Sequence, residues 1–293
     1  MTRSFATLVG FIAILLWALL ALFTVGSAPT PPLLLNAICF GIGGTIGVVW
    51  GIVTGKLASL RFVPARVYVF GTLGLFGYHA LYFSALRNAP AAEAGLIAYL
   101  WPLLIVLLSG LLPGERLRGG HLLGACLGLA GAALIILGGG TGFDPAHAKG
   151  YLLAIACALT WSTYSVGSRR FGDVPTASVI VFCLVSSALS AGLHLMLEDT
   201  VWPTGTMGWT STIALGLGPV GLAFYVWDIG VKLGDIQLLG TASYAAPLLS
   251  TLVLVAAGFA APTWSLALAA LLITTGALCA ALASLKSGRS GGS

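Results

Sequence analysis

Few side chains in this 293-residue sequence could do polar chemistry, because only 8 are Asp or Glu and 4 are His. Asp228 precedes Lys232 by four residues, a spacing that places an acid and a base on one helix face. Such residues either form a structural ion pair, or the carboxylate binds a proton or a substrate amine. His79, flanked by Tyr78 and Tyr82, could likewise bind substrate or carry a proton. No metal, nucleophile or phosphate-loop motif is present. We therefore predict no enzyme activity, no catalytic residue, no metal and no cofactor.

Aromatic residues offer a second kind of chemistry, because several occupy the central parts of long apolar segments. A buried indole or phenol needs a partner for its N–H or O–H, and the wall of a binding cavity can supply one. Such a wall stacks on an apolar side chain, donates to a carboxylate and presents ring faces to an ammonium. A zwitterion with an apolar side chain is the predicted ligand. The predicted substrate-binding residues are Trp17, Tyr78, His79, Tyr82, Tyr99, Trp101, Trp161 and Tyr244.

Composition identifies the solvent that surrounds these residues. Hydrophobic residues make up 58% of the sequence and charged residues 7%, against about 25% charged in ordinary soluble domains. The mean hydropathy is +1.04. A soluble fold could not cover its surface with so few charges, so we predict an integral membrane protein in a lipid bilayer. The 13 Lys and Arg residues are scattered, which argues against a nucleic-acid partner.

Long uncharged runs, divided where Pro and Gly cluster, predict an all-α membrane protein with ten transmembrane helices. The predicted spans are 5–25, 33–54, 67–86, 92–112, 121–138, 150–168, 177–197, 208–231, 236–258 and 264–285. Residues 287–293 are expected to form a flexible tail. Pro102, Pro219 and Pro247 interrupt the fourth, eighth and ninth spans, and we predict hinges there.

Loop charge predicts the orientation of the spans. With ten spans, the side that holds the N-terminus carries 11 Lys and Arg residues and the other side carries only Arg87 and Lys149. Positive loops remain in the cytoplasm, so both termini are expected there. Glu115 lies beside Arg116 and Arg118. We expect the three residues to belong to a cytoplasmic loop that sets the topology.

An internal duplication is visible when the sequence is shifted by 145 residues. Tyr99 and Pro102 then fall on Tyr244 and Pro247, and at a shift of 144 Trp17 falls on Trp161. The matches predict a first repeat over 1–140 and a second over 141–286. Since each repeat would hold five spans, the second enters the membrane inverted, an arrangement typical of alternating-access carriers.

These features together resemble one known family. The duplicated five-span pattern, Tyr99-Leu-Trp-Pro102 and Gly114-Glu-Arg-Leu117 are similar to the EamA-like branch of the drug/metabolite transporter superfamily. With Gly77-Tyr-His-Ala-Leu-Tyr82, the chain most resembles the YddG-type exporters. The resemblance implies export of amino acids, aromatic ones among them, from the cytoplasm across a bacterial inner membrane.

Other functions remain open from the residues alone. Efflux of lipophilic cations would use a membrane carboxylate, and Asp228 is the candidate, since Glu93 at the start of the fourth span suits helix capping. Nucleotide-sugar exchange would need basic residues in mid-span, and a lipid-modifying enzyme would need a nucleophile or metal cluster; the sequence has neither. A non-transporting scaffold would leave the duplication unexplained. Proton coupling and oligomeric state are not predicted.

Overall fold

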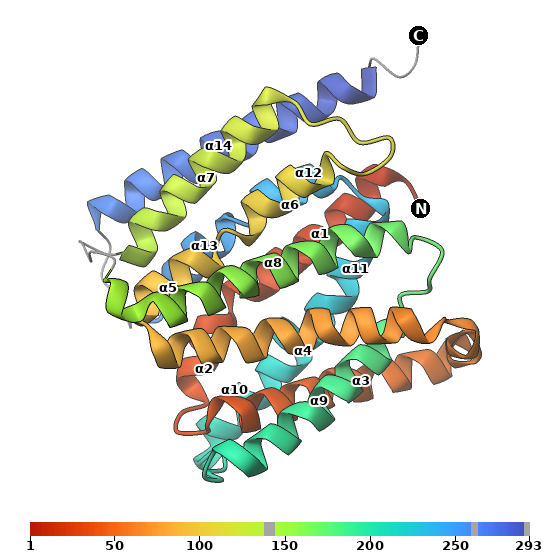
Figure 1. Ribbon diagram of the computed structural model, residues 1–293, viewed down its shortest axis with the longest axis vertical. Coiled ribbons are helices and arrows are strands. Elements are labelled where there is room, and N and C mark those ends of the chain that lie inside the picture. The colour runs from red at the N-terminus through yellow and green to blue at the C-terminus, as the bar shows by residue number, and fades with distance from the viewer. Residues whose placement is uncertain (138–143, 259–262, 290–293) are drawn as a thin grey trace.

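The computed structural model describes residues 1–137, 144–258 and 263–289, and these residues form helices joined by short connections, with no strand among them (Figure 1). The helices are α1 (Arg3–Ala18), α2 (Leu20–Gly26), α3 (Pro32–Val53), α4 (Ala65–Asn88), α5 (Ala91–Ala98), α6 (Trp101–Ser109), α7 (Gly119–Leu137), α8 (Ala148–Arg170), α9 (Ser178–Leu197), α10 (Gly205–Leu217), α11 (Ala223–Leu233), α12 (Ile236–Ala242), α13 (Ala245–Ala256) and α14 (Trp264–Arg289). Three short helices complete them: η1 (Lys56–Phe62), η2 (Pro145–His147) and the π-helical turn η3 (Gly218–Leu222).

In the described residues, each of the ten predicted spans overlaps one or two helices, but these helices are not equally apolar. In the described part of the chain, eight helical segments are long and apolar enough to cross a bilayer. The other two predicted spans correspond to α5–α6, where the apolar helix Glu93–Ser109 is shorter, and to α8. Helix α8 has 23 residues, but its second half is rich in Ser and Thr and its basic residues lie at its two ends. The chain is thus a helical membrane protein with several apolar spans.

Helix interruptions occur at or just before the three prolines that were predicted to be hinges. The fourth span breaks at Tyr99-Leu100, and Pro102 follows in the first turn of α6; the ninth breaks at Ser243-Tyr244, and Pro247 follows in the first turn of α13. Proline suits a first turn because its missing N–H would have no partner there. Pro219 lies inside η3, where the helix widens to a π turn. The structure therefore has a local irregularity at each position predicted as a hinge.

The most extensive helix contacts join the first half of the chain to the second. The four most extensive pairs are α1 with α11, α3 with α9, α4 with α8 and α7 with α14. Glycine permits the closest approach: a Cβ on Gly124 would lie 2.4 Å from the carbonyl oxygen of Gly276, and one on Gly43 would lie 2.8 Å from the Cα of Gly221. In Figure 1, α7 and α14 form one side of the bundle and α3 and α9 the opposite side.

The bundle has two ends, which we name after a buried glutamate at each. The Glu115 end carries the start of α1, η1 and the α6–α7, α8–α9 and α11–α12 connections. The Glu198 end carries the α2–α3, α4–α5 and α9–α10 connections. In Figure 1 the Glu115 end, with the N-terminus, is on the right. Helix α14 also ends on that side, so the start of α1 and the end of α14 lie at the same end of the bundle.

Candidate functional site

Seven of the residues predicted to bind substrate form one continuous set of ring contacts. Tyr78 is the centre of one part: its ring centroid lies 6.1 Å from Tyr82, 5.2 Å from His79 and 5.3 Å from Trp161. Trp17 and Trp101 extend the set, with centroids 5.9 and 6.3 Å from Trp161, and Tyr99 lies 6.3 Å from Trp101. The residues come from α1, α4 and α8, the start of α6 and the break before it. Both halves of the chain thus contribute.

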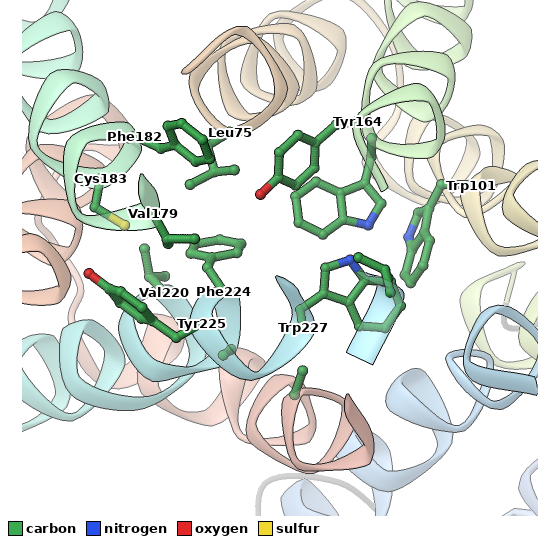
Figure 2. Packing of buried hydrophobic residues seen from close by; sticks show 14 of the residues in the cluster. Leu75, Trp101, Tyr164, Val179, Phe182, Cys183, Val220, Phe224, Tyr225 and Trp227 are labelled. Carbon is green, nitrogen blue, oxygen red and sulfur yellow. The ribbon is translucent and has the colours of Figure 1, made fainter. Parts of the chain in front are cut away.

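Trp227 on α11 belongs to the same set and was missed by the sequence reasoning. Its ring centroid lies 5.0 Å from Trp17 and 5.9 Å from Trp101, and the side chain is 0% exposed. Figure 2 shows Trp227 facing Trp101, with Tyr164 and Phe224 nearby. The 145-residue shift places Trp227 on Tyr82, and this match could have identified it. We call Trp17, Tyr78, His79, Tyr82, Tyr99, Trp101, Trp161 and Trp227 the aromatic cluster.

Hydrogen bonding divides the aromatic cluster into two kinds of residue. Trp17 Nε1 donates to the carbonyl oxygen of Pro219 at 3.1 Å, and Trp227 Nε1 donates to Ser165 Oγ at 3.1 Å. Within the described residues, five other polar groups have no protein partner: the hydroxyls of Tyr78, Tyr82 and Tyr99 and the indole N–H groups of Trp101 and Trp161. A donor that has no protein partner can pair with a ligand, so these five groups are available to a ligand with acceptor oxygens.

His79 supplies an acceptor beside those donors. Its Nδ1 lies 2.8 Å from the carbonyl oxygen of Leu75, which can only accept, so Nδ1 carries the proton. The Nε2 of the neutral ring is then a free acceptor, because it has no partner among the described residues. Phe40 and Phe224 contact the imidazole edge-on, at centroid distances of 5.1 and 6.1 Å. His79 can therefore accept a hydrogen bond from an ammonium in apolar surroundings.

Burial changes along the aromatic cluster. Tyr78, Tyr82 and Tyr99 are half-buried. Trp101, Trp161 and Trp227 are only 5%, 3% and 0% exposed. Tyr82 lies six residues before the end of α4 at the Glu198 end, whereas Trp227 lies six residues before the end of α11 at the Glu115 end. The cluster is therefore more accessible on the side of the Glu198 end.

Tyr244, the eighth predicted substrate-binding residue, lies outside the aromatic cluster. Its side chain is 0% exposed and belongs to a second core cluster with Val106 and Leu248. The hydroxyl accepts a hydrogen bond from the Leu103 N–H at 3.1 Å. That amide lies in the first turn of α6, where backbone donors lack helical partners. Tyr244 thus caps α6, a role different from the substrate contact predicted for it.

Asp228 and Lys232 form the i,i+4 ion pair that their spacing predicted as one of two possibilities. Asp228 Oδ2 lies 2.9 Å from Lys232 Nζ and accepts a hydrogen bond from Thr176 Oγ1 at 2.8 Å. Lys232 Nζ also donates to the carbonyl oxygen of Val174 at 3.0 Å. The pair therefore ties α11 to the connection between α8 and α9. This arrangement leaves the carboxylate charge compensated within the protein.

The described residues contain no group of three or more His, Cys, Asp or Glu side chains that could hold a metal ion. What the aromatic cluster can do is bind: it combines apolar ring faces, five unpaired donors and one imidazole acceptor. Together with the apolar spans, this site is typical of a membrane carrier for a small molecule that has both polar and apolar groups.

Comparison with known proteins supports that class. The model of the EamA-like transporter family matches residues 4–137 and 148–282. The chain belongs to this family, and it is therefore a transporter and not an enzyme. The resemblance inferred from its motifs is confirmed.

Two relatives indicate the part of the family that this chain resembles. It is 58% identical to the aromatic amino acid exporter YddG of Ancylobacter novellus over 285 residues, which cover 96% of this chain and 99% of that protein. The YddG exporter of Salmonella typhimurium is 27% identical, over 86% of this chain and 88% of that one. A solved crystal structure with 56% identity superposes with a TM-score of 0.94 and covers 97% of this chain and 99% of that chain.

Proposed function

We propose that this protein exports amino acids with apolar or aromatic side chains across a bacterial inner membrane by alternating access. The observation that carries the proposal is the aromatic cluster, where five donors without protein partners and the His79 acceptor adjoin apolar ring faces. A substrate carboxylate would accept from the tyrosine and tryptophan donors, its ammonium would donate to His79 Nε2, and its side chain would stack on the rings. The name of the relative from Ancylobacter novellus supports this substrate class.

Two halves of five spans each are part of the proposal. The family model matches the chain twice, over residues 4–137 and 148–282. The helix pairs support an exchange symmetry: if each span is replaced by its counterpart in the other half, α1–α11 becomes α8–α4, and the pairs α3–α9 and α7–α14 map onto themselves. Inverted halves that contact one another in this way can rock about a shared site.

The proposed orientation in the membrane rests on charge. Eleven Lys and Arg residues belong to segments of the Glu115 end, and only Arg87 and Lys149 to the other. The positive-inside rule then supports a cytoplasmic Glu115 end, with both termini in the cytoplasm. The half-buried tyrosines would face the periplasm in this conformation.

Efflux of lipophilic cations is the alternative, and the surroundings of Asp228 weigh against it. Its charge is compensated by Lys232 at 2.9 Å, and Thr176 donates to the same carboxylate. A cation carrier needs a carboxylate that the substrate can reach. The structure thus favours a zwitterion, whose charges balance within the ligand, over a ligand with a net positive charge.

Uptake into proteoliposomes tests the proposal. We expect flux of labelled apolar and aromatic amino acids, competed by their unlabelled forms, with lysine and glutamate as matched charged controls that compete poorly. Runs with and without a pH gradient would determine proton coupling. If cationic dyes move instead, and Asp228→Asn abolishes that movement, the cation-efflux alternative replaces this proposal.

A further inference from the structure

We propose that Arg3, Glu115, Arg169 and Asp235 form an ionic latch that closes the Glu115 end of the bundle and opens when the carrier changes state. The latch rests on the proposed alternating access, but not on the identity of the substrate. It gives Glu115 a role other than that of a topology-setting loop residue.

Glu115 is the centre of the latch because it pairs with two arginines. Arg3 Nη2 lies 3.1 Å from Glu115 Oε2 and 3.5 Å from Asp235 Oδ2, and Arg169 Nη2 pairs with Glu115 Oε1. The Glu115 side chain is only 5% exposed. Two positive and two negative charges balance within the group. Removing one member of an ion pair that has a buried partner is destabilising, because the buried charge that remains is no longer compensated.

The four residues connect segments that are far apart in the sequence. They belong to the start of α1, the α6–α7 connection, the end of α8 and the α11–α12 connection. Arg169 Nη1 also donates to the carbonyl oxygens of Val231 and Gly234, at 3.0 and 2.8 Å. Both halves of the chain are thereby joined at this end.

Directly beside the latch, the backbones of α1 and α11 touch. A Cβ on Gly230 would lie 2.6 Å from Gly10 Cα, and one on Gly234 would lie 2.8 Å from the Thr7 backbone nitrogen. Thr7 Oγ1 accepts a hydrogen bond from the Asp235 N–H at 2.8 Å. Farther along the same two helices are Trp17 and Trp227, whose rings lie 5.0 Å apart. Separation of α1 from α11 would therefore expose the aromatic cluster toward the Glu115 end.

The network at the Glu198 end has a different geometry. Glu198 accepts from Arg87 Nη2 at 3.0 Å and from the backbone N–H groups of Leu33 and Leu34 at 3.1 and 3.2 Å. His194 Nδ1 lies 3.0 Å from the same carboxylate. These contacts connect the end of α9 to α3 and α4, two helices that already pack against α9, and they do not cross between α1 and α11. Glu198 is thus a matched control: a buried glutamate with an arginine partner at the opposite end.

Hydrogen–deuterium exchange of the full-length protein in nanodiscs, without substrate, tests the latch. In Glu115→Gln we expect the Asp235 amide to exchange about tenfold faster, because the inward-open population grows. Alternating access also requires the opposite side to close, so exchange around the Tyr99-Leu100 break should slow. In Glu198→Gln the Leu33 and Leu34 amides should exchange faster, without acceleration at Asp235.

Arg3→Gln provides a milder variant, since Arg3 is half-exposed and lies at the chain start. Exchange should again become faster at Asp235 and slower around Tyr99-Leu100, by smaller factors than in Glu115→Gln. Unchanged Asp235 exchange in both latch variants would overturn the proposal. Faster exchange at Asp235 with no slowing at Tyr99-Leu100 would also overturn it, because that result describes local fraying. Neither outcome depends on whether amino acids are transported, so failure of the substrate assignment is distinguishable.

Discussion

The aromatic residues of this protein divide into two groups according to whether their polar atoms are paired. Trp227 donates to Ser165, Tyr225 donates to the carbonyl oxygen of Gly43, and Tyr244 accepts from Leu103. Across the described chain, the polar groups of Tyr78, Tyr82, Tyr99, Trp101 and Trp161 have no such partner. The paired group contributes hydrogen bonds to the fold, and the unpaired group has hydrogen bonds left for a ligand. Residue type is the same in both, so pairing is the better criterion of a binding role.

Different energetic consequences follow for the two groups. Removing one partner of a buried hydrogen bond leaves the other unsatisfied, at a cost of about 1–3 kcal/mol. Removing a hydroxyl that has no protein partner leaves nothing unsatisfied in the folded chain. The same chemical substitution should therefore affect stability in one group and ligand affinity in the other.

The largest effect is expected for Trp227→Ala. The substitution opens a cavity in a fully buried site and removes the Ser165 hydrogen bond, which should cost about 3–5 kcal/mol of folding free energy. Thermal unfolding in detergent would show it as a large fall in melting temperature. Trp264→Ala is the matched control, because Trp264 is 92% exposed. Equal falls for the two variants would contradict the assignment of Trp227 to the core of the fold.

Tyr244→Phe should have a medium effect on stability and little on transport. It leaves the Leu103 N–H in the first turn of α6 without an acceptor, at a cost of about 1–3 kcal/mol. Unfolding measurements would detect the loss, while the apparent KM of folded protein in proteoliposomes should stay close to that of the wild type. A raised KM with unchanged stability would instead place Tyr244 in the binding site.

Tyr99→Phe should have the smallest effect on stability and act on the substrate instead. Stability should change by less than about 0.5 kcal/mol, whereas loss of one ligand hydrogen bond should raise the apparent KM by about threefold to tenfold. Initial rates against substrate concentration, compared with Tyr244→Phe, would measure the difference. If Tyr99→Phe unfolds as readily as Tyr244→Phe with normal KM, the division by hydrogen-bond pairing fails.

The helices were predictable because lipid imposes simple requirements on sequence. A continuous apolar run of sufficient length forms a helix in the bilayer, since no other local structure satisfies its backbone groups. Gly26 to Pro32 therefore separates two helices in the structure as predicted, and the prolines mark the interruptions in the fourth and ninth spans. The central aromatics could be selected for the same reason, because mid-span indoles and phenols need partners.

Other features depended on which side chains meet. Trp227 was overlooked because it ends an uncharged run beside Asp228, yet it lies 5.0 Å from Trp17 in the aromatic cluster. Tyr244 was predicted from its place near the middle of a span, but its side chain contacts α6 and α7. Glu115 was predicted only as a loop residue, because its two arginine partners are 112 and 54 residues away in the sequence.

The sequence by itself determined the membrane environment, the positions of the helices, the duplicated pattern and the family, because hydropathy and motif spacing are local properties of the chain. Only the tertiary structure decided which aromatic donors are paired, whether Asp228 is compensated and how Glu115 joins four distant segments. Hydrogen bonds and ion pairs depend on distances of about 3 Å between groups from different helices. Such distances follow from helix packing, which brings together residues from both halves of the chain.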